Sequence, residues 1–72
     1  MKAYMSVEVY KDRVLVGTVS SLGIVSEGLF ISPETVNLVK EKAFDIDGIV
    51  IEGNIEEVIF KDGSTSTHHI NW

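Results

Sequence analysis

The sequence contains no cysteine, and this absence excludes disulfide bonds, thiolate nucleophiles and zinc sites built from cysteine. Motifs for a nucleophilic serine elbow, a glycine-rich phosphate loop and a zinc-protease helix are missing as well. A chain of 72 residues also has difficulty enclosing a substrate cleft, which typically measures roughly 300 Å³ or more. We therefore expect no enzymatic activity, no catalytic or metal-binding residue and no cofactor.

Long apolar runs are absent too. Nothing approaches the roughly 18 consecutive apolar residues of a membrane-spanning helix, and the first eight residues lack the apolar run of a signal peptide. We expect a soluble, cytoplasmic protein without a membrane partner.

Basic residues are few and unevenly distributed. Residues 1–40 carry four acids and four bases, whereas residues 41–72 carry seven acids and two bases, so the net charge of −5 belongs to the C-terminal half. Phosphate contacts require Lys and Arg, so this half does not favour nucleic acid. Its negative charge favours a protein partner with a basic surface.

Apolar residues, in contrast, are plentiful. They make up 44% of the chain and include ten Val and eight Ile, while a domain this small buries only about 60% of its unfolded surface. The excess predicts a homodimer or burial against another partner. The alternative is a monomer whose sheet is covered on both faces.

One stretch has the pattern of a helix, predicted over residues 33–44. Ser32 can cap its first turn, Pro33 suits the first helical position and Glu34 places negative charge near the positive end of the helix dipole. The residues expected to face the core are Val36, Val39 and Ala43, whereas Leu38 lies off this stripe, so the helix could be covered on two sides.

The N-terminal part has the pattern of strands. Residues 3–10 alternate between apolar and polar, which predicts a half-buried strand. After a tight turn at Lys11 and Asp12, residues 13–19 are apolar on both faces, and Gly17 among them predicts a bulge or a close approach by another backbone. Residues 24–31 are predicted to form a short hairpin that leads into the helix.

The C-terminal part contains two predicted hairpins. In the first, a two-residue loop at Gly53 and Asn54 would place Glu52 beside Ile55, and a longer loop would align Val50 with Val58 instead. In the second, Asp62-Gly63 is expected to be a two-residue turn that returns residues 65–72 along residues 55–60.

Together these patterns predict one compact α+β domain over residues 1–72. Its sheet is expected to be small and mostly antiparallel, with five to seven short strands and the single helix packed on one face.

His68 and His69 lie near Glu56 and Glu57 in the second hairpin. A two-residue turn would place His68 across from Glu57 and His69 across from Glu56, as exposed pairs of favourable sign. Adjacent strand residues point to opposite faces, so both histidines cannot bind one metal ion. A pH-dependent interface is a second interpretation of the histidines.

The segment from Asp45 to Gly48 is similar in spacing to part of a calcium-binding loop. Aligned on the glycine, however, the first ligand position holds Ala43 and the twelfth holds Asn54, where a bidentate Glu is required. A helix end followed by a turn accounts for these residues better.

Residues expected to bind a partner come from the acidic half and from the outward face of the first strand. Tyrosines on such a face commonly anchor interfaces, although they could instead cover the sheet edge or a neighbouring strand. The predicted partner-binding residues are Glu52, Glu56, Glu57, Asp62, Tyr4 and Tyr10.

The order of an apolar strand that ends in a proline (residues 29–34), a helix and two further strands (residues 46–52 and 58–61) resembles the swapped-hairpin domains of the AbrB and MazE-antitoxin kind. The resemblance covers about half of the chain and implies an intertwined dimer that binds DNA through basic residues of its first strands. The chain offers only Lys2, Lys11 and Arg13 for that purpose.

The sequence thus favours a non-catalytic protein-binding or regulatory module, such as a small inhibitor or immunity-type protein. One alternative is a small dimeric DNA-binding regulator of the antitoxin kind. Another is a structural subunit of a larger assembly.

Overall fold

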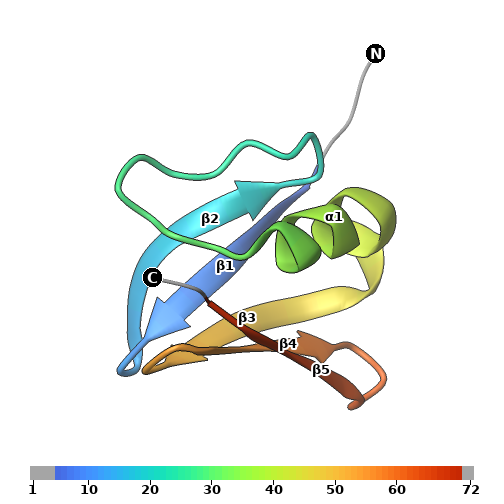
Figure 1. Ribbon diagram of the computed structural model, residues 1–72. Coiled ribbons are helices and arrows are strands. Elements are labelled where there is room, and N and C mark those ends of the chain that lie inside the picture. Colours follow the sequence, from blue (N-terminus) through green and yellow to red (C-terminus); the bar gives the residue numbers. More distant parts are fainter. Residues whose placement is uncertain (1–4, 71–72) are drawn as a thin grey trace.

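The computed structural model describes residues 5–70, and this part forms a five-stranded sheet with one α-helix (Figure 1). The strand order is β2-β1-β3-β4-β5; β1 and β3 are parallel and the other neighbours are antiparallel. The expected α+β fold is confirmed. Its elements are β1 (Ser6–Lys11), β2 (Val14–Ser20), α1 (Pro33–Lys42), the 3-10 turn η1 (Ala43–Asp45), β3 (Ile46–Glu52), β4 (Ile55–Phe60) and β5 (Thr65–His69).

Helix α1 begins where its capping residues predict. Ser32 has extended backbone angles, and its hydroxyl accepts a hydrogen bond from the Thr35 N–H at 3.3 Å. Glu34 lies in the first turn and Lys40 and Lys42 in the last, so the charges at both ends complement the helix dipole. The α-helix ends two residues earlier than expected, and η1 continues the chain into β3.

The core lies between α1 and one face of the sheet (Figure 1). Val39 is fully buried and packs with Val9 and Ile49, each also 0% exposed. Burial of one such side chain stabilises the fold by about 2 kcal/mol. The predicted stripe is partly wrong because Thr35 is fully buried, whereas Val36 is only half-buried.

The β1–β2 hairpin turns at Asp12 and Arg13, which both have positive φ (53° and 68°). This geometry matches the twist of the flanking strands. The strand register shifts next to Gly17, as expected of a bulge. A Cβ at Gly17 would lie 2.9 Å from the Cβ of Ser26, so the close approach is made by a side chain and not by the predicted backbone.

Residues 24–31 do not form the predicted hairpin. They make a single bridge to the sheet, between Val25 and Val19. The Ser20 N–H donates to the Ile24 carbonyl at 2.9 Å, and the Ser26 N–H donates to the Thr18 carbonyl at 3.0 Å. The segment therefore supplies hydrogen-bond partners for the outer edge of the second half of β2. If the segment had formed a hairpin of its own, these backbone groups would have been left unpaired.

The two C-terminal hairpins differ in loop length. Between β3 and β4, Glu52 pairs with Ile55, so the two-residue loop is the correct alternative. Between β4 and β5, the Phe60 N–H donates to the Ser64 carbonyl at 2.8 Å and the Gly63 N–H to the Phe60 carbonyl at 3.0 Å, which closes a three-residue loop. Gly63 supplies the positive φ of 93° that this loop requires.

The predicted two-residue turn was wrong, and the extra loop residue shifts the register by one. His68 therefore pairs with Glu56, and His69 pairs with Ile55. A shift of one residue exchanges the faces on which the side chains lie.

Among residues 5–70, the structure contains no helix with the length and apolar character needed to span a membrane.

Candidate functional site

The sheet has one face packed against α1, here called the covered face, and an opposite face, here called the open face. Residues paired across neighbouring strands share a face, so the register traces each face from β2 to β5. On the covered face one row is Gly17, Val9, Ile49, Val58 and Ser66.

The open face carries the neighbouring row. Across the five strands this row is Leu15, Tyr10, Val50, Glu57 and Thr67. By the same pairing and alternation, the rest of the open face comprises Ser6, Glu8, Thr18, Ser20, Gly48, Glu52, Ile55, Ile59, Thr65 and His69.

The open face combines apolar and acidic side chains. Leu15 and Ile55 are 49% and 39% exposed, and Tyr10, Val50 and Ile59 are half-buried. Within residues 5–70 no other layer covers this face, so these apolar groups remain accessible.

The charges of the open face have one sign. Glu8, Glu52 and Glu57 come from three different strands, and the strand residues that the structure describes add no Lys or Arg to this face. The surface consequently has a negative potential, which attracts a basic partner.

Tyr10 lies within this acidic surface. Its hydroxyl donates a hydrogen bond to the Glu8 carboxylate at 3.0 Å. This hydrogen bond, together with the negative charge of Glu8, raises the pKa of Tyr10 above its ordinary value of 10.0. The contact orients the ring on the surface, where tyrosine is an effective interface anchor.

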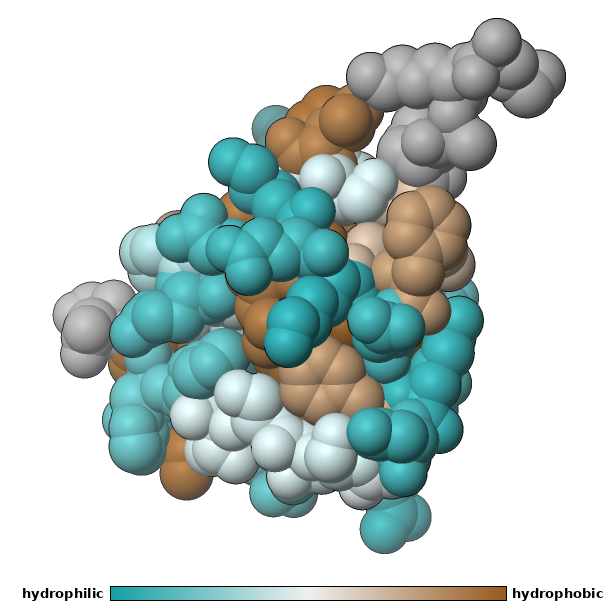
Figure 2. Space-filling view, turned by 90° about the vertical axis from the view of Figure 1, so that its right-hand side faces the viewer, coloured by the Kyte–Doolittle hydropathy of each residue, from teal (hydrophilic) through white to brown (hydrophobic). Residues whose placement is uncertain are grey.

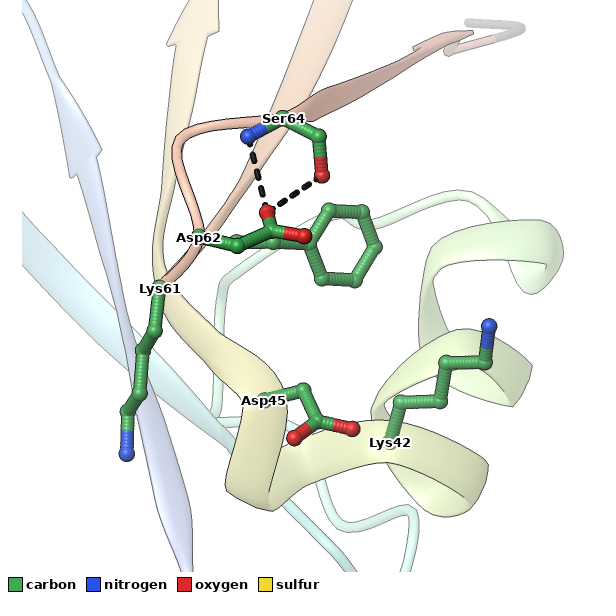
Figure 3. A pocket seen from close by; sticks show the side chains of 6 residues that line it. Lys42, Asp45, Lys61, Asp62 and Ser64 are labelled. Atoms are coloured by element: carbon green, nitrogen blue, oxygen red, sulfur yellow. Dashed lines mark hydrogen bonds between the residues drawn. The ribbon is translucent and has the colours of Figure 1, made fainter.

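Asp62 lies in the β4–β5 loop, at a separate cavity of about 330 Å³. The cavity lies between Lys42 and Asp45 at the end of the helical segment and Lys61, Asp62 and Ser64 of the loop (Figure 3). The Ser64 hydroxyl and N–H donate to Asp62 Oδ1 at 2.6 and 2.9 Å, and these bonds lower the pKa of Asp62. The carboxylate is therefore engaged in shaping the loop.

Three of the predicted partner-binding residues, Glu52, Glu57 and Tyr10, lie together on the open face. Asp62 is exposed but belongs to the loop. Glu56 lies on the covered face and is 0% exposed, so its carboxylate is not available to a partner in this structure. Tyr4 lies outside the described residues.

Glu56 forms a buried polar network with the start of α1. Its carboxylate accepts hydrogen bonds from the Ser32 N–H at 2.6 Å, the Ser32 hydroxyl at 2.8 Å and the Thr35 hydroxyl at 2.5 Å. Ser32 and Thr35 are themselves buried. The carboxylate thus satisfies donors at the positive end of the helix dipole and ties α1 to β4.

His68 extends this network to β5. Its Nδ1 lies 2.7 Å from the Thr35 hydroxyl oxygen, and its Nε2 lies 3.1 Å from the Ser66 hydroxyl. Because the single Thr35 hydroxyl proton is donated to Glu56, the contact with Nδ1 requires a proton on that nitrogen. In a neutral imidazole, Nε2 is then left to accept from Ser66.

The order serine, histidine, hydroxyl and carboxylate is similar to the hydrogen-bonded order of nucleophilic serine sites. Catalysis also requires space for a substrate beside the nucleophile. The adjacent cavity of about 350 Å³ is lined by Ser32 and His69, but not by Ser66 or His68. The structure thus supports a structural role for the network, which attaches the N-terminus of α1 to β4 and β5.

The sequence pointed to Ser32, Glu56 and His68 separately but not to their contact. One signal for the burial of Glu56 was present. Glu56 lies two residues before the buried Val58 in β4, so the two side chains lie on the same face of the strand. Thr35 carried no such signal. Its position depends on how α1 crosses β4 and β5.

Within residues 5–70, no group of three His, Cys, Asp or Glu side chains is placed so that it could hold a metal ion. Asp45 belongs to η1, and Asp47 lies in β3. The helical segment ends at Asp45 as predicted, but the predicted turn is wrong, because Ile46, Asp47 and Gly48 belong to β3.

Figure 2 shows the side of the molecule at which α1 ends and the β4–β5 loop lies. Hydrophilic side chains predominate there, with hydrophobic side chains scattered among them.

No protein-family model matches the chain, and neither a curated protein nor a solved structure matches it.

Proposed function

We propose that this protein is a non-catalytic protein-binding module that regulates or inhibits a partner by covering a basic surface. The observation that carries the proposal is the open face, where three carboxylates surround accessible apolar side chains and no Lys or Arg of a described strand intervenes. Apolar contacts supply affinity in such interfaces, and charge complementarity supplies specificity and speed of association.

The rigidity of the surface also supports binding. Tyr10, Val50 and Glu57 occupy three hydrogen-bonded strands whose other face is anchored to the core. A surface held in this way loses little conformational entropy when it binds.

The proposal includes a homodimer, as the apolar excess of the sequence suggests. Eight large hydrophobic side chains are at least 39% exposed among the described residues. Three of them, Val14, Leu15 and Val16, are consecutive in β2, and contiguous exposed apolar surface commonly marks an association site.

The test uses the double variant Glu52→Lys/Glu57→Lys to capture partners from a lysate of the native cells. The matched control is Glu34→Lys/Glu41→Lys, which makes the same charge change at exposed positions of α1. We expect a basic protein to be captured by the wild type and the control, to be lost from the open-face variant and to be released by added salt.

Equal capture by both double variants would contradict the proposed surface, and capture that does not respond to salt would contradict the electrostatic part. Retention of the protein on duplex DNA at physiological salt, abolished by charge reversal at Lys11 and Arg13, would favour the DNA-binding alternative instead.

A further inference from the structure

Strand β2 lies at the edge of the sheet, and its outer edge is only partly covered. The backbone bonds from residues 24–26 reach Thr18 and Ser20. In the described part of the chain these bonds stop at Thr18, so residues 14–17, here called the free edge, lie beyond them. An uncovered strand edge is a template for pairing with another chain.

The side chains of the free edge are unusual for such a position. Val14, Leu15 and Val16 are 61%, 49% and 41% exposed. Soluble proteins commonly protect edge strands with charged residues or proline, but β2 contains neither over its whole length of Val14–Ser20.

We propose that the free edge pairs with the same edge of a second copy of this chain. Antiparallel pairing about a two-fold axis at Leu15 would place Val14 beside Val16 of the second copy. The two five-stranded sheets would then form one continuous sheet. This inference rests on the proposed homodimer and names the surface that forms it.

The charge distribution favours a second copy of this chain as the partner that pairs with the free edge. Residues 1–40 carry four acids and four bases, whereas the net charge of −5 belongs to residues 41–72. Two copies that meet through β2 keep their acidic halves apart, because β5 lies at the opposite edge of the sheet. A charged partner finds no charge to recognise within β2 itself.

The bulge beside Gly17 limits the extent of this pairing. The register shift strengthens the local twist and leaves only a short segment for a partner strand. We therefore expect a reversible dimer whose population depends on concentration.

The experiment measures solution mass by sedimentation equilibrium over about 1 µM to 1 mM. The test variants are Val14→Lys and Val16→Lys, which leave the open-face residues unchanged. The control is Phe44→Lys, which adds the same charge at a side chain that is 64% exposed on η1. We expect the wild type and the control to double in mass from 8.0 kDa, and both edge variants to stay monomeric.

A wild type that remains monomeric throughout, edge variants that still dimerise or a control that fails to dimerise would each overturn the proposal. Growth beyond the dimer would overturn it as well, because a two-fold interface is closed. If the edge variants fail to fold, amide hydrogen exchange of the wild type decides the question. Protection at residues 14–16 must then rise with concentration.

Failure of this proposal is distinguishable from failure of the proposed partner binding. The edge variants should still capture the basic partner, and Glu52→Lys/Glu57→Lys should still dimerise. Loss of dimerisation in the open-face variant would show that the two surfaces are not separate.

Discussion

A carboxylate has a different role on each face of the sheet, as the neighbouring residues Glu56 and Glu57 show. Glu56 lies on the covered face, is 0% exposed and accepts three hydrogen bonds from the start of α1. Glu57 lies on the open face, half-buried beside Val50. A carboxylate on one side of the strand therefore holds the fold together, and its neighbour is available for recognition.

The largest expected effect comes from removing the charge of Glu56. Glu56→Gln keeps one acceptor oxygen and replaces the other with an NH2 group, so either the Ser32 N–H or the hydroxyl groups of Ser32 and Thr35 lose their acceptor. We expect a loss of about 3 kcal/mol in the free energy of unfolding. Urea denaturation followed by circular dichroism measures it.

Glu57→Gln is the matched control, with an expected change within about 0.5 kcal/mol. Similar losses for the two variants would mean that the faces do not differ as described.

The space around the two strand glycines, Gly17 and Gly48, also differs between the covered face and the open face. Gly17 lies on the covered face, where a new Cβ would come within 2.9 Å of Ser26 and 3.1 Å of Leu29, so Gly17→Ala should destabilise the fold by about 2 kcal/mol. Gly48 lies on the open face, where the nearest atom would be the Glu8 carbonyl oxygen at 3.8 Å. Gly48→Ala should therefore be neutral or stabilising by about 0.5 kcal/mol. Thermal denaturation of both variants tests this difference, and equal effects would contradict it.

On the open face, Glu8→Gln should lower the pKa of Tyr10 toward its ordinary value of 10.0, because the hydrogen bond to a carboxylate and the repelling negative charge are both removed. The raised pKa of Tyr10 means that the contact stabilises the fold below pH 10.0 and that this stabilisation is lost as the pH rises through the raised value. Titration of the Tyr10 ring resonances by NMR measures the shift. An unchanged pKa would show that the contact with Glu8 is not formed in solution.

The smallest effect is expected at the exposed β4–β5 loop. Ser64→Ala removes one of the two donors to Asp62, so the pKa of Asp62 should rise toward 3.8. The lowered pKa contributes stability above pH 3.8 that is lost as the pH falls through the lowered value, and the variant should lose part of this dependence. NMR titration of the Asp62 carboxyl carbon checks the direction, and a pKa that falls instead would refute the assignment.

Much of the fold was predictable because its signals are local. Ser32, Pro33 and Glu34 marked the start of α1, alternation marked β1, and Gly53 with Asn54 marked the β3–β4 loop. Each signal acts over one turn of chain, so no distant contact is needed to interpret it.

The hairpin expected over residues 24–31 failed for a non-local reason. This segment pairs with the edge of β2 instead of with itself, as the bonds to Thr18 and Ser20 show. Nothing within the segment indicates which strand it will meet.

By itself, the sequence determined the α+β class, the beginning of the helix, the acidic character of the C-terminal half and the apolar excess. The tertiary structure determined which side chains lie on which face of the sheet. The third residue in the Lys61–Gly63 loop placed His68 opposite Glu56, and the crossing of α1 brought Thr35 between them. The physical reason is that side chains alternate with a period of two along a strand, so a difference of one loop residue exchanges interior for surface.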